Sequence, residues 1–243
     1  MSFNWIKQKI PYYLLIAPAV ILSTCVILIP SVTTIISSFT DWNGISEDMT
    51  FIGLQNYKEL FSDEVFVTAL GNNCKWMFIY LIIPVSIALI AAVGLLKQKK
   101  KSALFQVMFL FPYVVAPIAN ALIWLNMIYS PLTGLVGFMK NIFGLDWMAS
   151  PLTQPNTALF GVAAADIWHY WGYLAVVFFS ALRQTPSDYV EAATMDGCNG
   201  RQLFRYIYFP SMLPTFKMML VLIIIQSFLQ FDYVYLLTSG GPA

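Results

Sequence analysis

The chain has 243 residues, of which 59% are hydrophobic and only 10% are charged, and its net charge is +1. Soluble domains carry about 25% charged residues, so this composition excludes an ordinary soluble protein and favours a membrane protein. No basic stripe with interleaved aromatic residues is present, which argues against nucleic-acid binding. The cysteines and the single histidine are too far apart for a zinc or redox motif, so we expect neither a metal nor a cofactor.

Long apolar runs predict the fold class. A helix of about 20 residues crosses about 30 Å of hydrocarbon, and in lipid a single segment must satisfy its own backbone groups as a helix. We therefore predict an all-α polytopic membrane protein, a helical bundle that forms a single transmembrane domain over residues 1–243. A sixth helix is expected beyond the end of this chain, which stops on a Gly-Gly-Pro turn. The five predicted spans are approximately Tyr12–Phe39, Trp76–Leu96, Ala103–Ile128, Thr157–Leu182 and Leu213–Leu237.

The distribution of basic residues predicts the orientation. If the N-terminus is cytoplasmic, ten lysines and arginines fall on the cytoplasmic side of the predicted helices and three fall on the other side. Such a bias follows the positive-inside rule. The ten are Lys7, Lys9, Lys97, Lys99, Lys100, Lys101, Arg183, Arg201, Arg205 and Lys217, and the three are Lys58, Lys75 and Lys140.

A polar, amphipathic segment, residues 184–214, lies between the fourth and fifth predicted helices. Thr185 and Asp188 have the spacing of a capping box, so a short helix is expected to start there. Gly197 is expected to end that helix in a left-handed conformation.

A second short helix is predicted from Arg201 to Phe209, with Pro210 stopping it. The two short helices would form a cytoplasmic elbow. Such an elbow either lies on the lipid headgroups or docks a protein partner, and the residue pattern leaves both readings open.

This segment resembles the EAA loop of ABC-importer permeases, whose pattern is E-A-A-x-x-D-G-A followed at fixed spacing by F, I, L-P and P. Two positions depart from the pattern, because Cys198 stands where alanine is usual and Phe209 where leucine is usual. The layout of the whole chain also resembles the carbohydrate-type permeases, which include glycerol-phosphate importers. The docking loop that the resemblance implies comprises Glu191, Ala192, Ala193, Asp196, Gly197, Arg201, Phe204, Ile207, Pro210 and Pro214.

The resemblance implies mechanical coupling to other subunits. In relatives this loop sits in a cleft of a cytoplasmic ABC ATPase, and closure of the ATPase dimer on ATP turns a pair of permeases from inward- to outward-facing. The resemblance also implies a second permease subunit, in many cases a non-identical one, and an extracytoplasmic solute-binding protein. The expected location is the plasma membrane of a prokaryote.

The chain shows no catalytic machinery of its own. It has no G-x-x-x-x-G-K-[ST] phosphate loop and no local signature of a nucleophile with its base. We therefore predict that it is not an enzyme and that a separate polypeptide hydrolyses ATP.

Ionisable residues at membrane depth are costly and indicate function. Asp166 and His169 lie three residues apart in the fourth predicted helix, and Tyr173 follows one turn later, so all three share one helical face. An aromatic wall beside hydrogen-bonding groups suits a sugar ring, and this face is predicted to line a solute path. The alternatives are an internal Asp–His pair that joins helices, or groups close enough to the outer surface to stay hydrated. Further candidates for the path are Asn120, Gln226 and Gln230.

The predicted function is that of a permease subunit in an ATP-driven importer for a sugar or related polyol, working by alternating access. Within the transport class, a glycerol phosphate or a polyamine is the alternative solute. A secondary transporter without an ATPase would show inverted repeats, and none is apparent. A membrane scaffold or sensor would use the elbow to bind another cytosolic partner.

Overall fold

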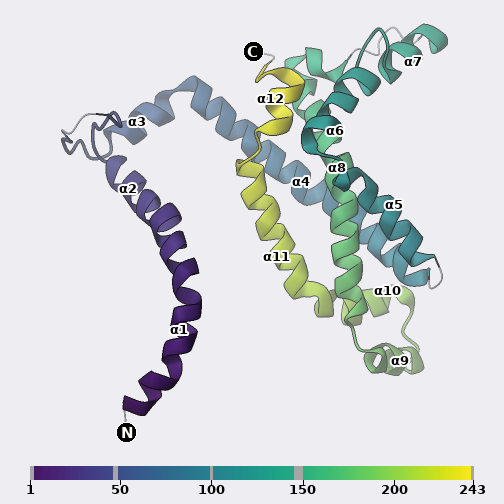
Figure 1. Cartoon of the computed structure of the whole chain (residues 1–243). Coiled ribbons are helices and arrows are strands. Elements are labelled where there is room, and N and C mark those ends of the chain that lie inside the picture. Colours follow the sequence, from purple (N-terminus) through teal and green to yellow (C-terminus); the bar gives the residue numbers. More distant parts are fainter. Residues whose placement is uncertain (1–2, 46–48, 99–100, 145–149, 242–243) are drawn as a thin grey trace. The chain divides into compact units, whose positions relative to one another are not determined.

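The computed structural model describes residues 3–45, 49–98, 101–144 and 150–241, and within them the regular structure is helical apart from one isolated β-bridge (Figure 1). Lys99, Lys100, Pro242 and Ala243 lie outside the described residues. The α-helices are α1 (Phe3–Ser23), α2 (Ile29–Ser37), α3 (Gln55–Ser62), α4 (Glu64–Lys97), α5 (Ser102–Val114), α6 (Pro117–Ile123), α7 (Leu135–Phe143), α8 (Pro155–Arg183), α9 (Ser187–Met195), α10 (Gly200–Leu203), α11 (Phe209–Phe228) and α12 (Asp232–Thr238). Short segments of π-helix occupy Thr24–Leu28, Trp124–Ile128 and Phe204–Tyr208, and a 3₁₀ turn occupies Pro151–Thr153.

Contacts divide the chain into two units, Met1–Ala69 and Leu70–Ala243, which are described separately. Among the described residues, four helical segments are long and apolar enough to cross a membrane, and a bent pair brings the number to five. This count agrees with the predicted all-α polytopic membrane protein.

The first unit contains one membrane-length helical segment, Tyr12–Ser37, and none of the residues in its most apolar stretch is buried within the chain. A π-helical turn joins α1 to α2 and ends two residues before Pro30. Proline has no N–H and its ring collides with the carbonyl four residues earlier. The wider π turn moves that carbonyl aside, so the helix continues through the proline.

Beyond α2, hydrogen bonds made by the side chains of Asp41 and Asn56, here called the clasp, order the start of the connection to α3. Asp41 accepts hydrogen bonds from the backbone N–H of Thr50 at 2.8 Å and from its hydroxyl at 2.5 Å. These bonds stabilise the carboxylate and lower the pKa of Asp41 below its usual value. The side chain of Asn56 in α3 donates to the backbone oxygens of Ser38 and Thr40 at 3.0 and 2.8 Å. The clasp thus fixes α3 to the end of the first span.

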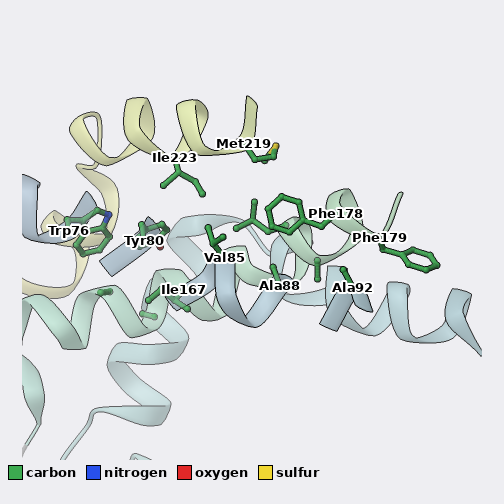
Figure 2. Packing of buried hydrophobic residues seen from close by; sticks show 14 of the residues in the cluster. Trp76, Tyr80, Val85, Ala88, Ala92, Ile167, Phe178, Phe179, Met219 and Ile223 are labelled. Carbon is green, nitrogen blue, oxygen red and sulfur yellow. The ribbon is translucent and has the colours of Figure 1, made fainter. Parts of the chain in front are cut away.

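The core of the second unit lies where α4, α8 and α11 meet. Figure 2 shows Met219 and Ile223 of α11 directed toward the layer formed by α4 and α8. Small residues on α4, Ala88 and Ala92, are fully buried and leave room for Phe178 of α8, which is also fully buried. Alternation of small and large side chains lets the three helices interdigitate at the density of a protein interior.

Gly172 sets the distance between α5 and α8. A Cβ atom at this position would lie 1.8 Å from the backbone oxygen of Phe109 in α5. No side chain fits at that distance, so only glycine allows the two backbones to approach so closely. The sequence analysis did not identify this residue.

The third predicted span, Ala103–Ile128, is not one continuous helix. It is broken into α5 and a second leg, Pro117–Ile128, bent by 89°. Val115 and Ala116 have extended backbone, with ψ values of 129° and 138°. A residue before proline is pushed out of the helical region, and Pro117 cannot donate to a preceding carbonyl, so the helix restarts in a new direction.

The fifth predicted span, Leu213–Leu237, also differs from the structure. The membrane-length helix covers Gly200–Phe228, and α12 is a separate short helix beyond a break at Leu229. Near its end, the Ser227 hydroxyl donates to the Ile223 carbonyl at 2.7 Å, a bond that bends helices. No proline or glycine marks this break, so the sequence analysis gave one continuous helix.

Candidate functional site

A cavity of about 340 Å³ lies in the second unit, lined by residues of α4, α5, α8, α11, α12 and the α11–α12 break. Five of the six residues predicted for the solute path line it, so the structure brings residues of α8 and of the α11 region together. The shared face of α8 is confirmed, because its three predicted members all line this cavity. The five lining residues are Asp166, His169, Tyr173, Gln226 and Gln230.

Asp166 binds the α11–α12 break. It is 8% exposed, and its Oδ2 accepts a hydrogen bond from Nε2 of Gln230 at 2.9 Å. Gln230 lies between Leu229, where α11 ends, and the start of α12. A carboxyl group on one helix therefore holds the interrupted part of another.

His169 binds the α5–α6 break. Its Nε2 lies 3.0 Å from the carbonyl oxygen of Val115. In a continuous helix that carbonyl would accept a bond from Ala119, but the extended backbone removes this partner. A carbonyl only accepts, so Nε2 must carry the hydrogen and donate. The predicted alternative of an Asp166–His169 pair is wrong, because each side chain binds a different broken helix.

Asn120, the sixth predicted residue, does not line the cavity. It is fully buried in α6, where Nδ2 donates to the Ala165 carbonyl at 3.1 Å and to the Tyr233 hydroxyl at 2.8 Å. Tyr233 does line the cavity, so Asn120 positions part of its wall. Buried amides between membrane helices have this joining role more often than a binding role.

Aromatic rings form much of the cavity wall. Trp76 and Tyr80 of α4 stack with ring centroids 5.3 Å apart, and Tyr113 of α5 stacks on Tyr173 at 4.6 Å. The sequence analysis missed Trp76, Tyr80, Tyr113 and Tyr233. The one-turn spacing of Trp76 and Tyr80 places them on one face of α4, but no pattern in the sequence says that this face meets α8.

The Tyr80 hydroxyl is the most informative group in this wall. Tyr80 is only 6% exposed, and its hydroxyl lies near the Asp166 carboxyl group. Among the described residues the hydroxyl nevertheless has no hydrogen-bond partner. An unsatisfied buried hydroxyl is costly in folded proteins, so a small adjustment toward Asp166 or a partner from the cavity would stabilise it.

The predicted elbow lies at the end of the second unit opposite α6, α7 and α12 (Figure 1). Its first helix, α9, starts after Pro186, which occupies the N-cap position. The capping box predicted from Thr185 and Asp188 is wrong. The Thr185 hydroxyl is buried without a partner among the described residues, because Pro186 between the two is extended, with ψ at 136°.

Gly197 has the expected left-handed backbone, with φ at +81°. The N–H groups of Gly197 and Cys198 bond to the carbonyls of Thr194 and Ala193, each at 3.0 Å, and close the end of α9. A Cβ at Gly197 would meet nothing within 4 Å, so its conformation and not its surroundings requires glycine.

A capping box does exist in the elbow, but at Asn199, ahead of the second short helix. Asn199 Oδ1 accepts from the Gln202 N–H at 3.0 Å, and the Gln202 side chain accepts from the Asn199 N–H at 2.8 Å. The Asn-x-x-Gln spacing was the available signal.

The predicted stop at Pro210 is also wrong. The helical segment runs without interruption from Gly200 to Phe228, through both Pro210 and Pro214. A π-helical turn, Phe204–Tyr208, again ends two residues before the first proline. It accommodates the ring as the equivalent turn does before Pro30, so α10 is the first turn of the last span.

The predicted docking residues fall into two groups. Glu191, Ala192, Asp196 and Gly197 are exposed around the tip of the elbow, while Ala193 is buried against the rest of it. The second group lies along the start of the last span: Phe204 and Ile207 are half-buried, whereas Arg201, Pro210 and Pro214 are exposed.

A row of aromatic rings joins the second group to the core. Phe204 contacts Phe209 with ring centroids 5.9 Å apart, Phe209 contacts Phe216 at 5.4 Å, and Phe216 contacts the buried Phe178 of α8 at 5.7 Å. Phe209 is the position where leucine is usual in the EAA loop, and here its ring completes the row.

Comparison with known sequences places the chain in a family. Residues 84–243 match the family described as "Binding-protein-dependent transport system inner membrane component". A relative from Pyrococcus horikoshii, named as a probable ABC transporter permease protein, is 33% identical over 238 residues, which cover 97% of this chain and 81% of that protein. A relative from Thermoanaerobacterium thermosulfurigenes, named as a probable permease for starch degradation products, is 30% identical. That alignment covers 98% of this chain and 80% of that protein. An sn-glycerol-3-phosphate permease protein of Agrobacterium fabrum is 29% identical and covers 97% and 80%.

A solved structure has the same fold. The crystal structure of a bacterial alginate ABC transporter, in complex with an alginate pentasaccharide-bound periplasmic protein, aligns with a TM-score of 0.81 at 22% identity. The alignment covers 98% of this chain and 79% of that one. The family match and the 33% identical relative exclude an ATPase-independent secondary transporter and a scaffold, and the permease itself is not catalytic. The chain belongs to the inner-membrane components of binding-protein-dependent transport systems, as a multi-pass permease subunit of an ABC importer.

Proposed function

We propose that this permease translocates a sugar or a related polyol, that the cavity beside α8 is part of the solute path, and that the elbow docks a separate ATPase. The observation that best supports this proposal is the composition of the cavity wall. Aromatic faces lie there beside carboxyl, amide and hydroxyl groups on membrane-spanning helices. In this proposal the two units, Met1–Ala69 and Leu70–Ala243, belong to one transmembrane domain.

The wall chemistry suits a carbohydrate. The C–H faces of a sugar ring pack on aromatic rings, and the stacked pairs Trp76–Tyr80 and Tyr113–Tyr173 offer such faces. Sugar hydroxyls both donate and accept, so they can satisfy the Tyr80 hydroxyl and the Gln226 amide. Relatives named for starch degradation products and for multiple sugars support this solute class.

The elbow suits a protein partner in the cytosol. Met195 is 88% exposed and Tyr189 is 62% exposed, although the elbow is ordered by caps at both short helices. Exposed large side chains on a rigid turn favour docking over solvent contact. The ring row from Phe204 to Phe178 gives a mechanical connection from this surface to α8.

The partners and the orientation follow from the same proposal. The importer would contain a cytoplasmic ABC ATPase dimer, a second permease that is similar but non-identical, and an extracytoplasmic solute-binding protein. The N-terminus would be cytoplasmic and the membrane that of a prokaryote, as the positive-inside bias predicts. The first span, which buries nothing against its own unit, would contact lipid or the second permease.

A glycerol phosphate is the second candidate solute, because relatives named for sn-glycerol-3-phosphate transport match nearly the whole chain. Uptake into proteoliposomes that hold the complete importer tests both solutes. We expect ATP-dependent uptake of labelled neutral sugars or polyols, delivered by the importer's own binding protein. Uptake restricted to glycerol 3-phosphate would overturn the carbohydrate assignment.

A Tyr80→Phe variant tests the place of the cavity in the path. Among the described residues the hydroxyl makes no direct hydrogen bond, so its removal should change thermal stability little. If solute satisfies this hydroxyl, the KM for uptake should rise about three- to tenfold, the value of one hydrogen bond. Tyr235→Phe, on an exposed side chain that does not line the cavity, is the matched control. An unchanged KM in Tyr80→Phe would remove the cavity from the path.

A further inference from the structure

We propose that the cavity beside α8 repels anions, so that the permease carries neutral or positively charged carbohydrates and excludes phosphorylated or acidic ones. The inference rests on the proposed function and narrows its solute class. It separates this chain from the glycerol-3-phosphate and alginate importers that share its fold or family.

The first reason is the charge of the side chains that line the cavity. Two carboxyl groups, those of Asp166 and Asp232, line the cavity, and no lysine or arginine occurs among the described residues that line it. Asp166 is almost fully buried and no lysine or arginine side chain is among the described lining residues, so nothing beside it would compensate a second acidic group. A phosphate or carboxylate in this cavity would lack the cation that recognition of such groups requires.

His169 does not supply that cation site. Its Nε2 donates to the Val115 carbonyl, which is the bond that supports the broken third span. An anion could recruit this nitrogen only by taking it from a carbonyl that has lost its helical partner. The hydrogen on Nε2 of His169 is therefore committed to the fold, and burial of the ring disfavours its charged form.

The second reason is the set of hydrogen-bond donors and acceptors in the cavity wall. Asp166 accepts one bond from Gln230 and keeps further acceptor sites on its two oxygens. A solute that faces such a group must donate, as a sugar hydroxyl or an amino sugar does. A phosphate dianion only accepts, so it could not donate to the remaining acceptor sites of Asp166. The free Tyr80 hydroxyl can donate to a sugar oxygen in the same cavity.

Charged thiol reagents measure this property without knowledge of the solute. The importer is prepared with Cys25, Cys74 and Cys198 replaced by serine, and Gln226→Cys, which lines the cavity, is introduced. Labelling rates are compared for a trimethylammonium and a sulfonate methanethiosulfonate in membrane vesicles that hold the complete importer, with and without ATP. Each rate is divided by that for a small free thiol.

We expect the cationic reagent to react several-fold faster than the anionic one after this normalisation, because carboxyl groups line the cavity and no lysine or arginine does among the described residues. Asp166→Asn keeps the acceptor for Gln230 but removes an ionisable carboxyl group, and it should lower the ratio. Asp63→Asn is the matched control, since Asp63 does not line the cavity, and it should leave the ratio unchanged. A normalised ratio of one or below in the parent would overturn the inference and leave the solute path standing. A cysteine that reacts with neither reagent, with or without ATP, would overturn the proposed path itself.

Discussion

The cavity and the elbow, at opposite ends of the second unit, satisfy their polar groups over different distances in the sequence. Around the cavity, the bonds of Asn120, Asp166 and His169 join residues 45 to 113 positions apart. In the elbow, the capping bonds of Asn199 and Gln202 and the Thr194 bond span three or four positions.

This difference predicts how each region responds to change. The cavity exists only when α4, α5, α8 and α11 are all in place, so damage there should unfold or loosen the whole unit. The elbow organises itself, so damage there should leave the bundle intact and affect what the elbow contacts.

Gly172→Ala should have the largest effect. Its Cβ would lie 1.8 Å from the Phe109 oxygen, so α5 and α8 must separate, at a cost of about 3 kcal/mol or more. We expect a strong fall in the thermal unfolding temperature of the solubilised importer and in its yield. Gly71→Ala in α4, where a Cβ meets nothing within 4 Å, is the control and should be neutral or slightly stabilising. Equal behaviour of the two variants would contradict the close α5–α8 contact.

His169→Phe should have the next largest effect. Phenylalanine keeps a ring against Tyr113, whose centroid lies 5.3 Å away, but leaves the Val115 carbonyl without a donor. An unsatisfied buried carbonyl costs about 1–3 kcal/mol, which thermal unfolding should detect. His169→Gln retains a donor and should recover part of the loss. If both variants unfold as the parent does, the histidine does not support the break.

The fold was predictable where one physical requirement dominates. Lipid thickness and backbone satisfaction fix the helicity of the spans, and the first and fourth were predicted to within two residues at each end, whereas the second and the last begin 12 and 13 residues earlier than predicted. The breaks were not predicted. Pro84 lies inside the continuous α4, whereas Pro117 follows a bend of 89°. The sequence around a proline does not reveal whether a distant donor such as His169 will support the freed carbonyl.

The site was predictable to the extent that it lies on one helix. Asp166, His169 and Tyr173 share a face by helical geometry alone, and the structure places all three in the wall. Trp76 and Tyr80 come from a helix whose neighbours depend on tertiary packing, so no local pattern selects them. In the elbow, the cap predicted at Thr185 is absent from the start of α9, whereas the Asn199–Gln202 box at the start of α10 was present in the sequence and was not predicted.

Gly197→Val tests whether the elbow is ordered independently of the helical bundle. A β-branched residue at φ of +81° costs about 1–2 kcal/mol in backbone strain, but it meets no neighbouring atom. We expect the unfolding temperature of the bundle to stay the same, while ATP-driven uptake falls about tenfold or more because the tip of the elbow is displaced. Gly197→Asn tolerates the left-handed region better and should keep more uptake. A loss of bundle stability equal to that of Gly172→Ala would mean that the elbow is not a self-organised unit.

Asn199→Ala should have the smallest effect and the most local one. Removal of the cap leaves the Gln202 N–H without its partner and costs about 1 kcal/mol. The change should appear as faster amide hydrogen exchange in residues 200–203, with exchange in α4 and α8 unaltered. Asn199→Asp still accepts the bond and should keep the parent exchange rates. Because α10 continues without a break into α11, exchange that spreads past the π-helical turn at Phe204–Tyr208 would show that the elbow and the last span unfold together. Confinement to the first turn would instead identify that π turn as the boundary between the self-organised elbow and the packed bundle.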